Sequence, residues 1–212
     1  MSYCSDITKN RILECAQEVF LKDGFEKAQV GEIAKAANVT TGAIYRHFKN
    51  KEALFFALIE DVYTYTLNTV MEVENKSKDS AYKLQSGNVA GSAVIESMFS
   101  ETMRFVDYMY EHFDEFKLLF SCSKGSRVEN FTEEIVDRYS HKNMKLIKAS
   151  AGKKSSAYKM KELEVHIITK GYIASLCECI IHNIPYGEVS RYIRNIVVFQ
   201  YYGWRGLTRP LT

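Results

Sequence analysis

A short stretch near the N-terminus gathers side chains of the kinds that contact nucleic acids. Residues 40–51 carry hydroxyl, imidazole and basic groups around one glycine: Thr40, Thr41, Gly42, Tyr45, Arg46, His47, Lys49 and Lys51. Basic and hydroxyl groups donate hydrogen bonds to phosphate oxygens and base edges, and a glycine lets a backbone approach closely. The composition of this stretch therefore indicates a surface for binding DNA.

Two short helices are expected to hold these side chains in place. The first spans about 29–36 and the second about 40–47, with Ala37-Asn38-Val39 as the connection and Thr40 as the N-cap of the second helix. These dimensions are typical of a helix-turn-helix. The core expected behind both helices is apolar and consists of Phe20, Phe25, Val30, Ile33, Ala34, Val39, Ile44 and Phe48.

The second of these helices is expected to present two different faces. Ile44 and Phe48 anchor it from behind. The outward positions are small at the N-terminal end and aromatic or basic further on: Thr41, Gly42, Tyr45 and Arg46. This order suits a helix whose first turn is pushed against base edges in the major groove.

The segment from Arg11 to Leu58 resembles the DNA-binding domain of the TetR (tetracycline-repressor-like) family. The family's hallmark run is represented here by Thr40-Thr41-Gly42-Ala43-Ile44-Tyr45-Arg46-His47-Phe48-Lys49-Asn50-Lys51, and Glu32-Ile33-Ala34 with Ala37 and Val39 also fits. The resemblance covers about 48 residues and is specific, because apolar, glycine and basic positions match in register. The remaining three-quarters of the chain match only in being helical and of the expected length.

The resemblance implies a role for individual residues. Those implied to face the groove and read bases or sugar edges are Thr41, Gly42, Ala43, Tyr45 and Arg46. Those implied to contact phosphates are Thr40, Tyr45, His47 and Lys51, the last at the start of a fourth helix whose N-terminus adds partial positive charge. The chain has Ala28-Gln29 where the family often has a capping Thr or Ser, and Gln29 is expected to reach the backbone instead.

The whole chain is predicted to be all-α. Its only prolines are Pro185 and Pro210, and no strand-like alternation persists anywhere. The further helices are expected at about 8–22, ending at a left-handed Gly24, and at 51–75, 92–112, 114–122, 128–149, 160–183 and 187–203, with 75–91 as a polar connection. We expect a three-helix helix-turn-helix domain at 1–50 and a helical ligand-sensing and dimerisation domain at 51–212.

Composition excludes several classes of protein. Hydrophobic residues make up 46% and charged residues 25%, which excludes disorder. No run of about 20 apolar residues or signal-peptide layout occurs, so we expect a cytosolic protein with its five cysteines as free thiols. No Gly-rich phosphate loop, Ser-His-Asp spacing or HExxH motif appears, so neither enzymatic activity nor a cofactor is expected.

The last two helices are expected to form a homodimer interface. Small and apolar residues share one face of helix 160–183: Ile167, Gly171, Ala174, Ser175 and Ile181. Helix 187–203 offers Val189, Tyr192, Ile193, Ile196, Val197 and Gln200. Paired across a two-fold axis, the two helices would make a four-helix bundle. The alternative is that they complete the core of the monomer.

A group rich in aromatic residues and methionine lies between these regions. In TetR-like proteins this region commonly encloses an effector pocket, which here would include Phe99, Met103, Phe113, Phe116 and Phe120 and would take a small apolar or aromatic molecule. Ordinary core packing is the alternative, because apolar residues at helical spacing are usually core.

The cysteines support other functions poorly. Cys177, Cys179 and His182 lack the second ligand pair of a structural zinc site, and no Lys or Arg is placed to activate a thiol. The expected function is a sequence-specific, homodimeric DNA-binding repressor, released by a small effector and bound to a pseudo-palindromic operator. The alternative is a helical protein-interaction or adaptor module that has lost DNA reading.

Overall fold

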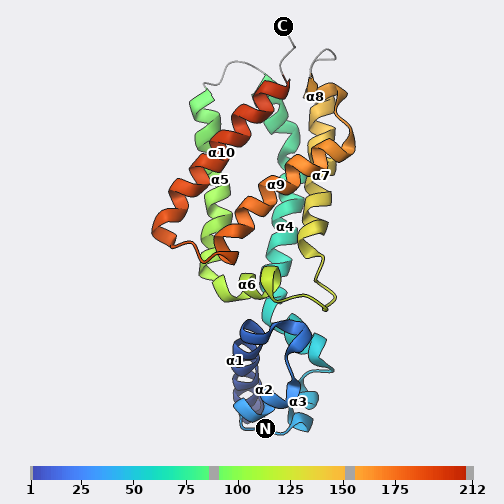
Figure 1. Ribbon diagram of the computed structural model, residues 1–212, viewed down its shortest axis with the longest axis vertical. Coiled ribbons are helices and arrows are strands. Elements are labelled where there is room, and N and C mark those ends of the chain that lie inside the picture. Colours follow the sequence, from blue (N-terminus) through green and yellow to red (C-terminus); the bar gives the residue numbers. More distant parts are fainter. Residues whose placement is uncertain (1, 86–90, 151–155, 209–212) are drawn as a thin grey trace. The chain divides into compact units, whose positions relative to one another are not determined.

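The computed structural model describes residues 2–85, 91–150 and 156–208, and these contain helices and no strand (Figure 1). The helices are α1 (Ser2–Lys27), α2 (Val30–Ala36), α3 (Thr41–His47), α4 (Lys51–Gln85), α5 (Gly91–Glu111), α6 (Phe113–Ser121), α7 (Phe131–Ser150), α8 (Ser156–Lys159), α9 (Glu162–Ile181) and α10 (Tyr186–Thr208). The predicted all-α fold class is confirmed.

The chain forms two compact units. The first contains the residues up to Thr66 together with His112–Phe131, and the second contains Leu67–Glu111 and the residues from Thr132 onward. The first unit is larger than the predicted segment 1–50, because α6 packs against α1 and the first part of α4 joins the same core. The helix-turn-helix itself ends at Phe48, the C-cap of α3.

The first unit is built around three aromatic rings. The centroid of the Phe55 ring lies 5.0 Å from that of Phe20 and 5.1 Å from that of Phe25, both in edge-on arrangements that favour aromatic packing. Helix α6 adds the buried Phe116, with Leu118 and Leu119 beside it. Because these residues come from α1, α4 and α6, the unit is held together by contacts distant in sequence.

The second unit contains two apolar clusters. The larger joins α5, α9 and α10 through Val106, Leu176, Cys179, Val189, Ile193 and Val197. The smaller joins the end of α7, α8 and the start of α9 through Ile147, Ala157, Met160 and Val165. Helix α10 crosses α5 obliquely in Figure 1, and the two helices are in contact.

The helices differ from the sequence prediction in several places. Helix α4 continues to Gln85 rather than ending near residue 75, because residues 76–85 contain neither glycine nor proline and polarity alone does not stop a helix. Helix α1 extends beyond Gly24, which has the positive φ expected of it (72°) but with ψ at 164°, so it kinks the chain instead of capping it. The short α8 was not predicted.

Candidate nucleic-acid interface

The turn between α2 and α3 depends on Asn38. Its φ of 51° places it in the left-handed region, where asparagine is among the better tolerated residues. The amide of Val39 then donates to the carbonyl of Ala34 at 2.9 Å and closes the turn. The Oγ1 atom of Thr40 accepts a hydrogen bond from the amide of Ala43 at 3.1 Å, which confirms Thr40 as the N-cap of α3.

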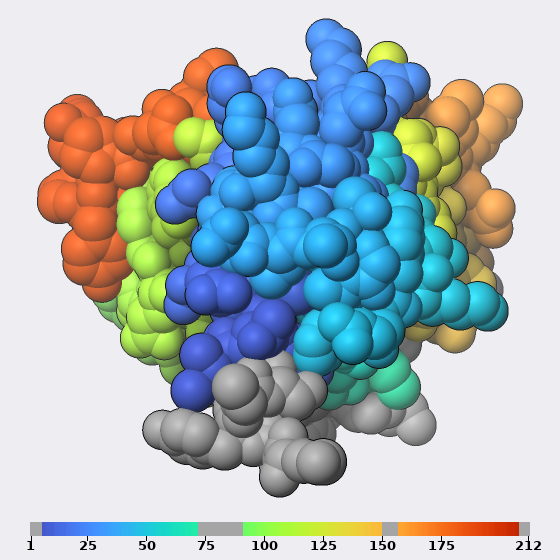
Figure 2. All heavy atoms as spheres, turned by 90° about the horizontal axis from the view of Figure 1, so that it is seen from below, coloured from blue at the N-terminus to red at the C-terminus, as the bar shows by residue number. Residues whose placement is uncertain are grey.

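Helix α3 presents the two faces predicted for it. Ile44 and Phe48 are buried, with 1% and 5% of their surface exposed. The side chains on the opposite face, Thr41, Tyr45 and Arg46, are exposed together with Gly42, and Tyr45 keeps 51% of its surface accessible. Figure 2 looks onto this part of the chain, where the atoms of α2 and α3 lie at the near surface in shades of blue. His47 is half-buried.

Ala43 differs from the role that the resemblance implied for it. It is buried, with 9% of its surface exposed, and lies beside Ile44 on the inward side of α3. A seven-residue helix has room for only one inward stripe, and Ala43 falls within that stripe. Its methyl group therefore packs against the protein and does not face a groove.

Gly42 is not required by the packing of this chain. A Cβ atom added there would meet only the Oγ1 atom of Thr40, at an ordinary van der Waals distance of 3.8 Å. The described residues therefore leave room for a side chain at this position. A close approach by something outside the chain would explain why glycine stands there.

Gln29 occupies the N-cap position of α2. Its backbone is extended, with φ at −109° and ψ at 129°, and its side chain makes no capping hydrogen bond. The side chain is exposed, so it remains available for contact with a ligand.

Lys51 is engaged within the protein. Its Nζ atom donates to the carbonyl oxygens of Phe25 at 2.7 Å, Ala28 at 3.1 Å and Glu26 at 3.4 Å, and lies 4.5 Å from the centroid of the Phe25 ring. A phosphate would have to compete with these acceptors for the ammonium group. Sequence reasoning assigned Lys51 to phosphate and found no signal for these contacts.

A second set of contacts was also missed from the sequence, in the loop between α6 and α7. The amide of Phe25 donates to the carbonyl of Cys122 at 2.7 Å. The guanidinium of Arg127 lies 3.8 Å from the centroid of the Phe56 ring, and its amide donates to Glu52 at 3.2 Å. The loop therefore holds both the end of α1 and the start of α4.

The residues predicted to line an effector pocket divide between the two units. In the first, Phe116 is fully buried and its ring lies 5.4 Å from that of Phe120, while Lys117 lies over Phe113. In the second, Phe99 and Met103 pack against the α5–α9–α10 cluster. The guanidinium of Arg194 covers the Phe99 ring at 4.2 Å and binds Glu96 through two hydrogen bonds, of 2.7 and 3.1 Å.

The two C-terminal helices differ in how well the predicted interface residues are exposed. On α9, Ile167 is 59% exposed and Ile181 36%, and Gly171 between them is also exposed. On α10 the prediction was wrong for Val189, Ile193 and Val197, which are completely buried because α10 packs on α5 and α9. Tyr192, Ile196 and Gln200 are half-buried. The large exposed apolar side chains described on α10 are instead Tyr186, at 57%, Phe199, at 75%, and Tyr202, at 60%.

The C-terminal cysteines are poorly placed for thiolate chemistry. Burial raises the pKa of the Cys177 thiol to about 12 and that of Cys179 to about 11, so both stay protonated near neutral pH. His182 is exposed and its Nε2 atom lies 2.7 Å from Glu178, one turn earlier on α9.

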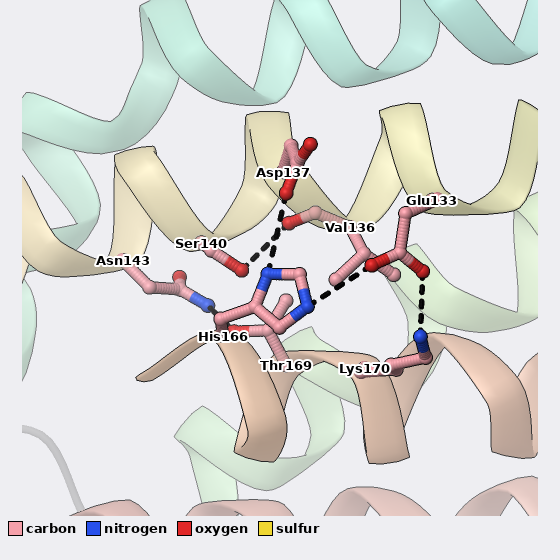
Figure 3. Close-up of polar contacts among 8 residues, drawn as sticks. All are labelled: Glu133, Val136, Asp137, Ser140, Asn143, His166, Thr169 and Lys170. Atoms are coloured by element: carbon pink, nitrogen blue, oxygen red, sulfur yellow. Dashed lines mark hydrogen bonds and ion pairs between the residues drawn. The ribbon is translucent and has the colours of Figure 1, made fainter. Parts of the chain in front are cut away.

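A polar cluster links α7 and α9 in the second unit (Figure 3). The two ring nitrogens of His166 on α9 face different carboxylates of α7: Nε2 lies 3.1 Å from Glu133 and Nδ1 lies 3.2 Å from Asp137. Lys170 donates to the other oxygen of Glu133, and this hydrogen bond holds the pKa of Glu133 below its usual range. The two carboxylates and the imidazole are near enough to ligate a cation, but exposed acidic groups like these are common without one.

Comparison with known proteins finds a match in the N-terminal part of the chain. Residues 12–58 match the model of the "bacterial regulatory proteins, tetR family". The transcriptional regulator AcrR of Shigella flexneri is 49% identical over 53 residues, and QacR of Staphylococcus aureus is 41% identical over 51. Residues 12–58 are therefore similar to the part of TetR-family regulators that this model describes.

The likeness in sequence covers a quarter of the chain, whereas the likeness in structure covers nearly all of it. The alignments span 25% of this chain and 25% of AcrR, and 24% of this chain and 27% of QacR, so they cover about a quarter of each protein. The crystal structure of NalD, described as the secondary repressor of the MexAB-OprM efflux pump in Pseudomonas aeruginosa, covers 98% of both chains with a TM-score of 0.58 and 19% identity. At that identity the likeness shows a shared fold, and no more.

Among the described residues, no helix is both long and apolar enough to cross a membrane.

Proposed function

We propose that this chain is a sequence-specific DNA-binding regulator of transcription that works in the cytoplasm as a homodimeric repressor released by a small effector. The observation that carries the proposal is the outward face of α3. Its exposed Thr41, Tyr45 and Arg46 have no structural task among the described residues, while Ile44 and Phe48 fix the helix from behind. A helix with this arrangement fits the major groove.

The groups on this face have complementary tasks in DNA recognition. The guanidinium of Arg46 suits the two acceptors that guanine presents in the major groove, and the hydroxyl groups of Thr41 and Tyr45 suit phosphates or base edges. Gly42 allows the first turn of α3 to come close to the bases. Gln29, at the start of α2, is placed to reach the sugar-phosphate backbone beside the groove.

Dimerisation supplies the specificity that one short helix lacks. Exposed apolar side chains lie on both C-terminal helices: Leu163 and Ile167 on α9, and Phe199 and Tyr202 on α10. Apolar surface of this kind is typical of an interface between copies. A two-fold pair would present two α3 helices about one turn of DNA apart and would read a pseudo-palindromic operator.

Dimerisation is tested by sedimentation of the wild-type chain and of Ile167→Glu. A charge in a two-fold apolar interface meets its own copy, so the variant should sediment as a monomer at concentrations where the wild type is a dimer. The matched control is Ile7→Glu, at a residue 52% exposed on α1. Identical behaviour of Ile167→Glu and the wild type would contradict the proposed interface.

Release by an effector is proposed as a shift between two populations. A small apolar or aromatic molecule bound among residues such as Phe99 and Met103 would favour a state in which the two α3 helices no longer match successive grooves. NalD is described as a repressor and a FadR structure as a complex with stearoyl-CoA, and these printed descriptions support a regulator of this kind.

The DNA-binding proposal is tested by selecting DNA from a random pool with the purified protein, followed by footprinting. We expect enrichment of a sequence with two-fold symmetry and protection of both half-sites. If the pool returns no common sequence, the chain does not read DNA, and an adaptor role for the fold becomes the better explanation.

A further inference from the structure

The polypeptide turns sharply between the main part of α1 and the start of α2. This corner, residues 24–29, begins at Gly24, whose φ of 72° and ψ of 164° break the helix. Carbonyl groups at the end of a helix have no partner in the following turn and need other donors. In this corner the carbonyls of Phe25, Glu26 and Ala28 all accept from one side chain.

That side chain is Lys51, whose ammonium group lies among the three carbonyls. An ammonium group has three N–H donors, and its three acceptors here lie at 2.7, 3.1 and 3.4 Å. The Phe25 ring adds a cation–π contact, since Nζ lies 4.5 Å from its centroid. Positive charge is also favourable beside the negative end of the α1 dipole. All three donors are therefore used within the chain.

The contacts of Lys51 tie three elements together. Lys51 is the first residue of α4, the acceptors belong to the end of α1 and the connection to α2, and α2 leads through Asn38 into α3. The α6–α7 loop holds the same corner through the hydrogen bond from the Phe25 amide to Cys122. A displacement of the corner would move α2, and with it the outward face of α3.

We propose that Lys51 is a positioning residue for DNA reading and does not hold a phosphate: it fixes the corner from which α2 and α3 project. The proposal rests on the DNA-binding function proposed above. Lys51 then affects sequence specificity indirectly, because it determines where Tyr45 and Arg46 lie.

Lys49 provides a matched comparison only two residues away. Its side chain is exposed, and no described residue binds its ammonium group. A phosphate contact by a lysine makes binding weaker as salt rises, with a slope of about 0.9 in log–log units for each phosphate. Removing such a contact therefore lowers the salt slope by about one, whereas removing a positioning contact leaves it unchanged.

The experiment compares Lys51→Met, Lys51→Arg and Lys49→Met with the wild-type chain. Each protein is titrated with its selected operator and with random duplex DNA across a salt series, and its melting temperature is measured. We expect Lys51→Met to melt lower, to lose about tenfold or more in operator affinity, and to keep its random-DNA affinity and salt slope. Lys49→Met should keep its melting temperature and lose about one unit of slope.

Lys51→Arg keeps the charge and guards against a Lys51→Met chain that fails to fold. A planar guanidinium cannot aim at three carbonyls around one point, so we expect reduced operator preference with an unchanged salt slope. Binding by Lys51→Arg equal to the wild type would overturn the proposal, as would a slope lowered by one in Lys51→Met at an unchanged melting temperature. If the wild-type chain selects no operator, the DNA-binding function fails first, and the positioning role fails with it.

Discussion

The outward face of α3 and the α1–α2 corner contain similar residue types used in opposite ways. On α3, Arg46 and Tyr45 are exposed, and no described residue forms a hydrogen bond or ion pair with either side chain. At the corner, the charge of Lys51 is surrounded by acceptors from the same chain. A basic residue in a recognition motif therefore cannot be given a ligand from its position alone. Its partners within the chain decide whether it is available.

The largest effect is expected on stability, from a substitution in the core next to the α1–α2 corner. Phe55→Ala removes a fully buried ring that packs against Phe20 and Phe25, and the substitution leaves a cavity. We expect a loss of about 3–5 kcal/mol in the free energy of unfolding, measured by denaturant titration. Tyr45→Ala is the control and should stay within about 0.5 kcal/mol of the wild type. Equal losses of stability in both variants would contradict the view that Phe55 holds the core while Tyr45 does not.

The next largest effect is on DNA binding, and it is expected only from substitutions on the outward face of α3. Tyr45→Ala and Arg46→Ala should each weaken operator binding by about 1–3 kcal/mol at constant salt, because each loses a contact with bases or phosphates. Their melting temperatures should match that of the wild type. Retention of full operator affinity by both variants would show that this face does not touch DNA.

The inward and outward faces of α3 could be predicted from the sequence, because they follow from the local spacing of apolar residues. The period of apolar residues placed Ile44 and Phe48 inward, and the hydroxyl group of Thr40 marked the start of α3. Ala43 was misassigned because a small residue near the edge of a stripe fits either face. The acceptors of Lys51 lie 23 to 26 residues away in the chain and belong to backbone carbonyls, which leave no trace in residue types.

The C-terminal helices illustrate the same limit. The sequence predicted helices here and assigned apolar residues of both to a dimer interface, but it did not say which of these residues face the monomer core. On α10, Ile193 is completely buried, whereas the ring of Phe199, further along the same helix, is 75% exposed. That choice depends on where α5 lies, which is set by the packing of the whole unit.

A smaller effect on DNA binding is expected from one of two helical glycines. Gly31 on α2 and Gly42 on α3 both have room for a Cβ atom. Replacement by alanine should raise stability by up to about 1 kcal/mol in each case, because glycine is unfavourable within a helix. Only Gly42→Ala should weaken operator binding, measured by fluorescence anisotropy. Equal affinity in both variants would mean that α3 does not approach DNA as closely as proposed.

The smallest effect concerns paired charges away from both regions. The hydrogen bond from Lys170 lowers the pKa of Glu133 in the folded chain. A lowered pKa contributes stability above the unfolded value, about 4.3 for a glutamate, and this contribution is lost as pH falls through the folded value. Glu133→Gln should therefore reduce the acid sensitivity of the melting temperature.

The most direct test of DNA reading by α3 is a competition between the selected operator and random DNA for the wild-type chain at about 150 mM salt. A face built to read bases should prefer the operator by about a thousandfold or more. Equal binding of the two DNAs would mean that the exposed face of α3 reads no sequence, and would contradict the central claim.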